Sequence, residues 1–192
     1  MINLKELEVL KRFTNKYADE RSLQHIKISD TYSVATDGHH GLVIKFGSLG
    51  ITKDLLIDTA PRNPHARDEK EIKYPEVLDL LKYKKEEYVT LNTADLSRYI
   101  EGICATATIG IVKIGDNQMR HANNTITINE LDFDQIFVSP EFLKNINIAL
   151  KKLAKLQVDI YRGENMLVFK SGNLTAFVLE IEICEKEEGW QE

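Results

Sequence analysis

The chain has 192 residues, of which 43% are hydrophobic and 29% charged, and its formal net charge at pH 7 is −5. This composition is close to that of folded domains, so it excludes a disordered or fibrous protein, and the length allows one large domain or two small ones. No apolar run approaches the roughly 20 residues that cross a bilayer, and the negative charge excludes a surface that is basic throughout. We therefore expect a cytoplasmic protein without membrane contact.

The first third of the chain predicts one amphipathic helix followed by short strands. Within residues 4–16, Leu7, Leu10 and Phe13 fall on one stripe of a helix, and a second stripe is basic. Runs rich in β-branched and aromatic residues follow and predict strands at 23–29, 32–36, 41–46 and 55–57.

A linker separates these elements from the rest of the chain. Residues 60–73 contain Pro61, Pro64 and many charges without helical or strand periodicity. The segment 74–81 then predicts a short helix, since Pro75 stands where a helix tolerates proline.

The remaining sequence repeats one pattern twice: a strand, a helix and three strands. The second helix begins at Ser139, Pro140 and Glu141, which supply an N-cap, a first-turn proline and a first-turn acid. The two helices start about 46 residues apart, which indicates a repeated structural unit. Helices that precede hairpin-linked strands predict an α+β fold, with antiparallel sheets covered by helices on one face. The elements are expected at 88–91, 94–104, 109–114, 118–122 and 125–128, and at 135–138, 140–153, 156–161, 166–169 and 174–183.

Four short stretches have distinctive sequences: VATDGHHGL at 34–42, KYPE at 73–76, FVSPEFL at 137–143 and AFVL at 176–179. Together they resemble segments of the sliding clamp, the beta subunit of bacterial DNA polymerase III. The sequence VATDGHHGL at 34–42 resembles the A-T-D-G-H-R-L hairpin of the clamp's middle domain, and KYPE at 73–76 resembles the F/Y-P-D segment near that domain's end. AFVL at 176–179 resembles the terminal A-Y-V-V strand, and FVSPEFL at 137–143 resembles the strand-to-helix entry before it. The resemblance implies a DNA-clamp-like fold whose helices face a central pore.

The resemblance also implies about one and a half clamp domains, because a clamp subunit has three domains of two units each. We expect a truncated domain at 1–86, whose end at about 59–86 is the linker, then a complete domain at 87–184 and an acidic tail at 185–192. Such a shortened clamp would suit a phage or mobile element.

In that family a partner-peptide cleft lies between the middle and last domains. His40 stands where the family has Arg, Gly41 is an extra residue, and the terminal M-P-M-R-L is replaced by EIEI at 180–183. A carboxylate beside an apolar cleft disfavours burial of an apolar anchor. By position, the cleft residues of this chain are Thr36, Gly38, His39, His40, Leu42, Val178 and Glu180.

Two helices carry cations at the same spacing of i, i+7 and i+11. Such rows can contact phosphates without reading the base sequence, although ordinary solvated helix faces are the simpler interpretation. On the middle helix, Arg98 stands between Asp95 and Glu101 and gives no such row. The candidate DNA-binding residues are Lys5, Arg12, Lys16, Lys144, Lys151 and Lys155.

These features together predict a non-enzymatic, sliding-clamp-like DNA replication accessory. It would bind double-stranded DNA non-specifically and would engage DNA polymerase or other replication proteins. One chain is too short to close a ring, so we expect a homo-oligomer, and a tetramer if twelve units make a ring as in the family.

A second hypothesis is a clamp-fold interaction protein that binds host replication proteins without encircling DNA. The shortened first domain, the altered cleft and the negative charge favour it.

A third hypothesis, an enzyme or metal site at Asp37, His39 and His40, is disfavoured. Adjacent histidines on a strand point to opposite faces, and the sequence contains no nucleophile elbow, phosphate loop or HExxH helix. Cys104 and Cys184 also lack CxxC spacing. We expect no catalytic residue, metal, cofactor or disulfide.

Overall fold

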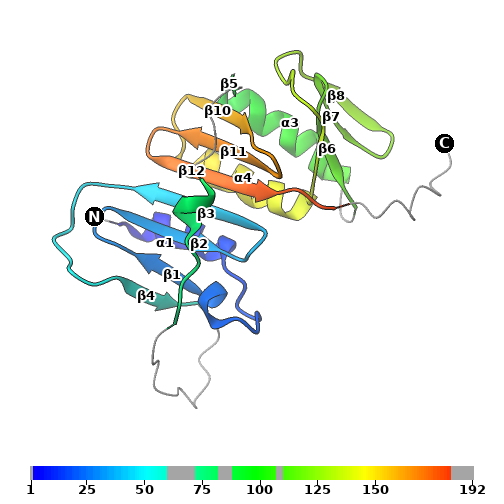
Figure 1. The fold of residues 1–192 in the computed structure, drawn as a ribbon. Helices are drawn as coiled ribbons and strands as arrows, with labels where there is room; N and C mark the ends of the chain where they lie inside the picture. Colours follow the sequence, from blue (N-terminus) through cyan, green and yellow to red (C-terminus); the bar gives the residue numbers. More distant parts are fainter. Residues whose placement is uncertain (1, 60–71, 82–87, 107–109, 183–192) are drawn as a thin grey trace.

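The computed structural model of the chain describes residues 2–59, 72–81, 88–106 and 110–182 (Figure 1). The predicted acidic tail, Cys184 and most of the predicted linker lie outside the described residues. The first part of the chain contains the helical segments α1 (Leu4–Leu10), η1 (Lys11–Phe13), η2 (Arg21–Gln24) and α2 (Val77–Leu80), and the strands β1 (His25–Ile28), β2 (Tyr32–Thr36), β3 (His40–Lys45) and β4 (Leu55–Asp58). The rest contains β5 (Tyr88–Asn92), α3 (Thr93–Thr106), β6 (Val112–Gly115), β7 (Gln118–His121), β8 (Asn124–Thr127), β9 (Ile136–Val138), α4 (Pro140–Leu153), β10 (Gln157–Arg162), β11 (Met166–Ser171) and β12 (Leu174–Leu179).

The described strands form two antiparallel sheets, which confirms the predicted α+β class. The larger sheet has eight strands in the order β4-β1-β2-β3-β12-β11-β10-β5, and the smaller has four in the order β8-β7-β6-β9. The larger sheet receives four strands from each of the two predicted domains, and the pairing of β3 with β12 joins the two sets. Whether residues 1–86 and 87–184 fold separately stays a prediction.

A repeated unit organises the chain. Its two complete copies are β5-α3-β6-β7-β8 and β9-α4-β10-β11-β12. They exchange their first strands, since β5 pairs with β10 and β9 pairs with β6. Their helices pack on each other, and Ser97 Oγ of α3 donates a 2.7 Å hydrogen bond to Asn147 Oδ1 of α4. The first copy, α1-β1-β2-β3, takes β4 as its edge strand instead.

The start of α4 follows its sequence signal. Ser139 is the N-cap, its hydroxyl accepts a hydrogen bond from Glu141 N–H at 3.3 Å, and Pro140 occupies the first turn. Because these signals act over three residues, they predict the start of this helix correctly.

The prediction for the end of the first helix is wrong. α1 begins with a capping box between Asn3 and Glu6, as its sequence favours. The chain becomes extended at Thr14, whose hydroxyl donates to the carbonyl of Lys11 at 3.0 Å. Threonine is β-branched and its hydroxyl competes for helical carbonyls, so Thr14 favours this early end.

The main hydrophobic core lies between the helices and the facing sides of both sheets. Buried side chains of α1, α3 and α4 meet alternate residues of the strands there, such as Leu42 of β3 and Val178 of β12. Side chains on the other face of the larger sheet pack beneath residues 72–81, and the Tyr74 hydroxyl donates to the Val34 carbonyl at 3.1 Å. This outer cluster consists of Val34, Val43, Tyr74, Val77, Tyr161, Val168 and Phe177. Across the described ranges, no helix is both long enough and apolar enough to span a membrane.

Candidate functional site

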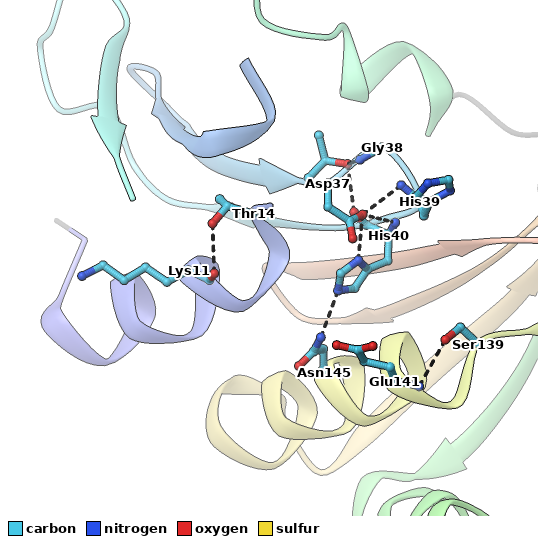
Figure 2. Close-up of polar contacts among 10 residues, drawn as sticks. Lys11, Thr14, Asp37, Gly38, His39, His40, Ser139, Glu141 and Asn145 are labelled. Atoms are coloured by element: carbon cyan, nitrogen blue, oxygen red, sulfur yellow. Dashed lines mark hydrogen bonds and ion pairs between the residues drawn. The ribbon is translucent and has the colours of Figure 1, made fainter. Parts of the chain in front are cut away.

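The β2–β3 hairpin carries the ATDGH motif in a turn fixed by side-chain hydrogen bonds (Figure 2). Thr36 Oγ1 donates to the His40 carbonyl at 2.8 Å. Asp37 Oδ1 accepts from the backbone N–H groups of His39 and His40 at 2.9 and 2.8 Å. Gly38 has φ +93°, a conformation that glycine adopts without steric cost. The motif therefore builds this turn.

His40 connects the hairpin to two helical segments. Its ring is only 2% exposed and lies between Phe13 of η1 and Phe142 of α4, with centroid distances of 4.7 and 4.5 Å. Nδ1 lies 2.9 Å from Asp37 Oδ1, and Nε2 lies 3.3 Å from Asn145 Nδ2 (Figure 2). With Nδ1 protonated toward the carboxylate, Nε2 can accept from the Asn145 amide. The imidazole thus holds the hairpin against the first turns of α4.

Asp37 keeps its charge in this environment. Burial acts to raise its pKa, but the hydrogen bond from His40, together with the backbone N–H groups of His39 and His40, outweighs burial and lowers the pKa of Asp37. An ionised carboxylate that accepts these N–H groups stabilises the turn.

A cleft of about 590 Å³ opens beside this hairpin, between the segment that follows α1 and the first turns of α4. Exposed cationic side chains of Lys11, Arg12 and Lys16 line it. Tyr17, which is 77% exposed, and Phe142 add aromatic surface. The carboxylates of Asp37 and Glu141 also line the cleft, so its cationic part is the side formed by Lys11, Arg12 and Lys16. That side suits an anionic ligand that also offers a flat or apolar group.

The structure does not gather the seven predicted cleft residues on one surface. Thr36, Gly38, His39 and His40 belong to the hairpin, but Leu42 and Val178 are fully buried in the main core on the helix side. Glu180 accepts a 3.1 Å hydrogen bond from Arg162.

Strand alternation explains the position of Leu42. Side chains alternate between the faces of a strand, so one inserted residue moves the next side chain to the other face. Gly41 takes the outer face, and the next residue, Leu42, points toward the helices.

The predicted DNA-binding residues lie near the helices but not in two matching rows. Lys5 is exposed on α1 and Arg12 on η1, whereas Lys16 and Lys155 lie beyond the ends of their helices. Lys144 is half-buried on α4. Exposed Lys152, which lies outside the i, i+7, i+11 spacing, is in the last turn of α4.

Carboxylates on α3 offset part of this charge. Lys151 of α4 forms a 2.6 Å ion pair with Glu101 of α3, and Arg98 pairs with Asp95 within α3.

Several cleft residues were not predicted. Lys11 stands next to Arg12 but falls outside the i, i+7, i+11 row. In the sequence, Phe142 is recognisable only as part of the apolar stripe of its helix. No local sequence pattern identifies Asn145 as a partner of His40, which lies 105 positions away. Within the described ranges, no group of three or more His, Cys, Asp or Glu side chains is placed to hold a metal ion.

Comparison with known proteins gives a fold but no family. No protein-family model and no curated protein matches the chain. Among solved structures, a putative DNA polymerase III beta subunit from Eubacterium rectale superimposes with a TM-score of 0.68 and 15% identity, over 94% of this chain and 63% of that one. The Helicobacter pylori beta clamp bound to a DNA ligase peptide superimposes with a TM-score of 0.67 and 12% identity, over 93% of this chain and 63% of that one. The DNA polymerase III beta subunit of Thermotoga maritima superimposes with a TM-score of 0.62 and 10% identity, over 98% of this chain and 65% of that one.

These similarities show the DNA-clamp fold, which confirms the predicted fold class. The chain spans less than two thirds of the length of these clamp subunits, covering 63% to 65% of them.

Proposed function

We propose that this chain is a clamp-type DNA replication accessory, not an enzyme, that acts in the cytoplasm as an assembly of copies. It binds duplex DNA non-specifically through the face that carries its helices. The observation that supports this proposal most strongly is the clamp fold itself, in which α1 and α4 cover the same face of the larger sheet and α3 packs on α4.

The charges of the helix face fit this role. Although the whole chain has a net charge of −5, exposed cations lie on or beside the helices at Lys5, Arg12 and Lys152. Cations that contact phosphates release condensed counterions, which gives affinity without base specificity. DNA binding by this face would therefore fall steeply with salt.

Fluorescence anisotropy with a labelled duplex tests the proposal. Between about 50 and 200 mM salt, log K should fall linearly with log salt, with a slope of about −0.9 for each phosphate neutralised. Reversing Lys5, Arg12 and Lys155 to Glu should cost at least about tenfold in affinity at low salt and flatten that slope.

A matched control reverses three lysines on the opposite face. Lys45, Lys113 and Lys170 lie on the sheet faces turned away from the main core, because the residue before each of the first and third, and both neighbours of the second, belong to that core. Their reversal to Glu gives the same change in net charge, and we expect little loss of affinity. Equal losses in both triple variants, or no affinity at low salt, would overturn the proposal.

Absence of DNA affinity would leave the second hypothesis, a phage or mobile-element protein that binds host replication proteins through the same fold. Recovery of a polymerase, clamp or loader in a pull-down from host extract would then be its test.

We also propose that the cleft beside His40 receives an acidic segment of a replication protein. This charge preference is supported by the three cations of the cleft, Lys11, Arg12 and Lys16, which outnumber its two carboxylates, Asp37 and Glu141. Titration with an acidic peptide and its amidated, neutral counterpart should show binding of the acidic one only, and Arg12→Glu should abolish it. Equal binding of both peptides would contradict the proposal.

A further inference from the structure

The chain passes beside the cation-lined cleft just before the described residues end. Leu179 N–H, at the end of β12, donates to the carbonyl of His39 at 2.8 Å, and His39 lines the cleft. Two positions later, Ile181 N–H donates to the carbonyl of Phe137 in β9 at 2.8 Å. Phe142 of α4 follows Phe137 by five positions and lines the cleft as well. The chain therefore leaves the described fold close to two walls of the cleft, the hairpin and the first turns of α4.

The sequence that follows is acidic and contains the single tryptophan of the chain. The predicted acidic tail, 185–192, lies outside the described residues and has the sequence EKEEGWQE, with four glutamates and one lysine. Trp190 follows Glu188 by two positions, so carboxylates and a flat aromatic ring come from the same short stretch. An anionic ligand with a flat group is what the cationic side of the cleft suits. The chain thus carries a sequence of this chemistry immediately after the residues that border the cleft.

The cleft offers matching groups to such a sequence. Lys11 and Arg12 are exposed, and Lys16 Nζ lies 5.0 Å from the centroid of the Tyr17 ring, which is itself 77% exposed. Of the two carboxylates in the cleft, that of Asp37 already accepts hydrogen bonds within its own turn. An acidic, aromatic ligand would therefore meet more cations than carboxylates, together with an open aromatic surface.

The tail is also long enough to enter the cleft. An extended chain covers at most roughly 3.6 Å per residue, so the eight positions from Glu182 to Trp190 span up to roughly 29 Å. The five positions from Phe137 to Phe142 span at most roughly 18 Å by the same measure. A tethered ligand has an effective concentration of about millimolar, so even a weak contact would be occupied for much of the time.

We propose that the acidic tail docks in the cleft of its own chain, with its glutamates beside the three cations and Trp190 against the ring of Tyr17. The docked tail takes the place of an acidic segment of another protein, so the cleft accepts a partner only when the tail is released. This inference rests on the proposed acidic preference of the cleft and adds control of that cleft by the chain itself.

Fluorescence of Trp190 in the full chain tests docking directly, because no other tryptophan contributes. Quenching by acrylamide should be at least about twofold weaker in the wild type than in Arg12→Glu, and salt should remove this difference by screening the charges. The control, Arg120→Glu, reverses an exposed arginine of β7 and should behave like the wild type. Equal quenching in the wild type and Arg12→Glu would overturn the inference. Protection that appears only at rising concentration would also overturn it, because the tail would then occupy the cleft of another copy.

Titration with a labelled acidic peptide tests the competition. The double variant Glu187→Gln, Glu188→Gln should bind the peptide at least about threefold more tightly than the wild type, because a docked tail lowers the fraction of open clefts. The control, Glu130→Gln with Asp132→Asn, removes two exposed carboxylates and gives the same change in net charge. It should bind like the wild type.

The two readouts separate this inference from the proposed function. If the tail variant and its control bind the peptide equally well, the inference fails and the proposal of an acidic partner segment stands. If no variant binds the peptide although Trp190 is protected in the wild type and released by Arg12→Glu, the tail docks as inferred and the partner proposal fails.

Discussion

The aromatic ring of Phe177 lies directly against the backbone of Gly41, across the joint between β12 and β3. A β-carbon added to Gly41 would overlap ring atoms Cε1 and Cζ and would lie 3.0 Å from the Ala35 carbonyl oxygen. Phe177 is itself 1% exposed and belongs to the outer cluster, so the ring has little room to move. The ring therefore fills the space on the outer face that a side chain at position 41 would need.

This contact predicts that Gly41→Ala destabilises the protein. The added methyl group must displace a buried ring, and overpacking of this kind costs about 1–3 kcal/mol. Urea unfolding followed by circular dichroism would measure the change in the free energy of unfolding.

A control and a second substitution make this prediction specific. Gly47→Ala should change stability little, because nothing lies within 4 Å of a β-carbon at that position. Phe177→Leu should recover part of the loss when combined with Gly41→Ala. If the effects of the two substitutions simply add, the two positions are not coupled through this contact.

At acidic pH, the dependence of the free energy of unfolding on pH should arise in part from Asp37. Burial acts to raise its pKa, but His40 and the backbone N–H groups of the turn lower it overall. The ionised form therefore stabilises the fold fully above the unfolded value of about 3.9, and that contribution is lost as pH falls through the lower, folded pKa.

Asp37→Asn should remove this dependence. We expect the variant to lose about 1–3 kcal/mol at pH 7 and to show a flatter decline in stability below about pH 4 than the wild type. Chemical unfolding between about pH 3 and 7 would measure both. The control, Asp132→Asn, changes an exposed carboxylate and should follow the wild-type profile. Parallel profiles for Asp37→Asn and wild type would contradict the assignment.

Local signals allowed much of the fold to be predicted. The start of α4 depends on Ser139 and Pro140, and the hairpin turn depends on Asp37 and Gly38, so neighbouring residues are sufficient to define both. The end of the first helix was missed because the hydrogen bond of Thr14 to a helical carbonyl competes with a continuing apolar stripe. Two local preferences opposed each other there, and sequence alone did not show which would prevail.

The candidate site could be predicted only in part, because its walls come from distant parts of the chain. Asn145 meets His40 across 105 positions, a contact that no local pattern encodes. The resemblance to clamps also assigned Leu42 to the cleft by position. With Gly41 on the outer face of β3, strand alternation places the Leu42 side chain in the main core instead.

Cys104 should be chemically inert in the native protein. Burial raises the pKa of its thiol to about 11, against the opposing effect of the Lys144 ammonium. With Cys184→Ser in place, alkylation by iodoacetamide at about pH 8 should be roughly a hundredfold slower in buffer than in urea, because the thiolate is the reacting species. Mass spectrometry over time measures both rates. Similar rates would mean that the thiol is exposed.

The ion pair between Lys151 and Glu101 should limit how strongly the helix face binds DNA. Their side chains are 52% and 51% exposed, so the pair itself adds little stability and Glu101→Gln should leave the unfolding free energy nearly unchanged. The freed ammonium can instead contact a phosphate. If the helix face binds DNA as proposed, duplex affinity at low salt should rise by up to about tenfold, and the slope of log K against log salt should steepen by up to about one. The control, Glu164→Gln, removes an exposed carboxylate from the β10–β11 turn and gives the same change in net charge. An equal gain from both substitutions would show that net charge, rather than release of Lys151, determines the affinity.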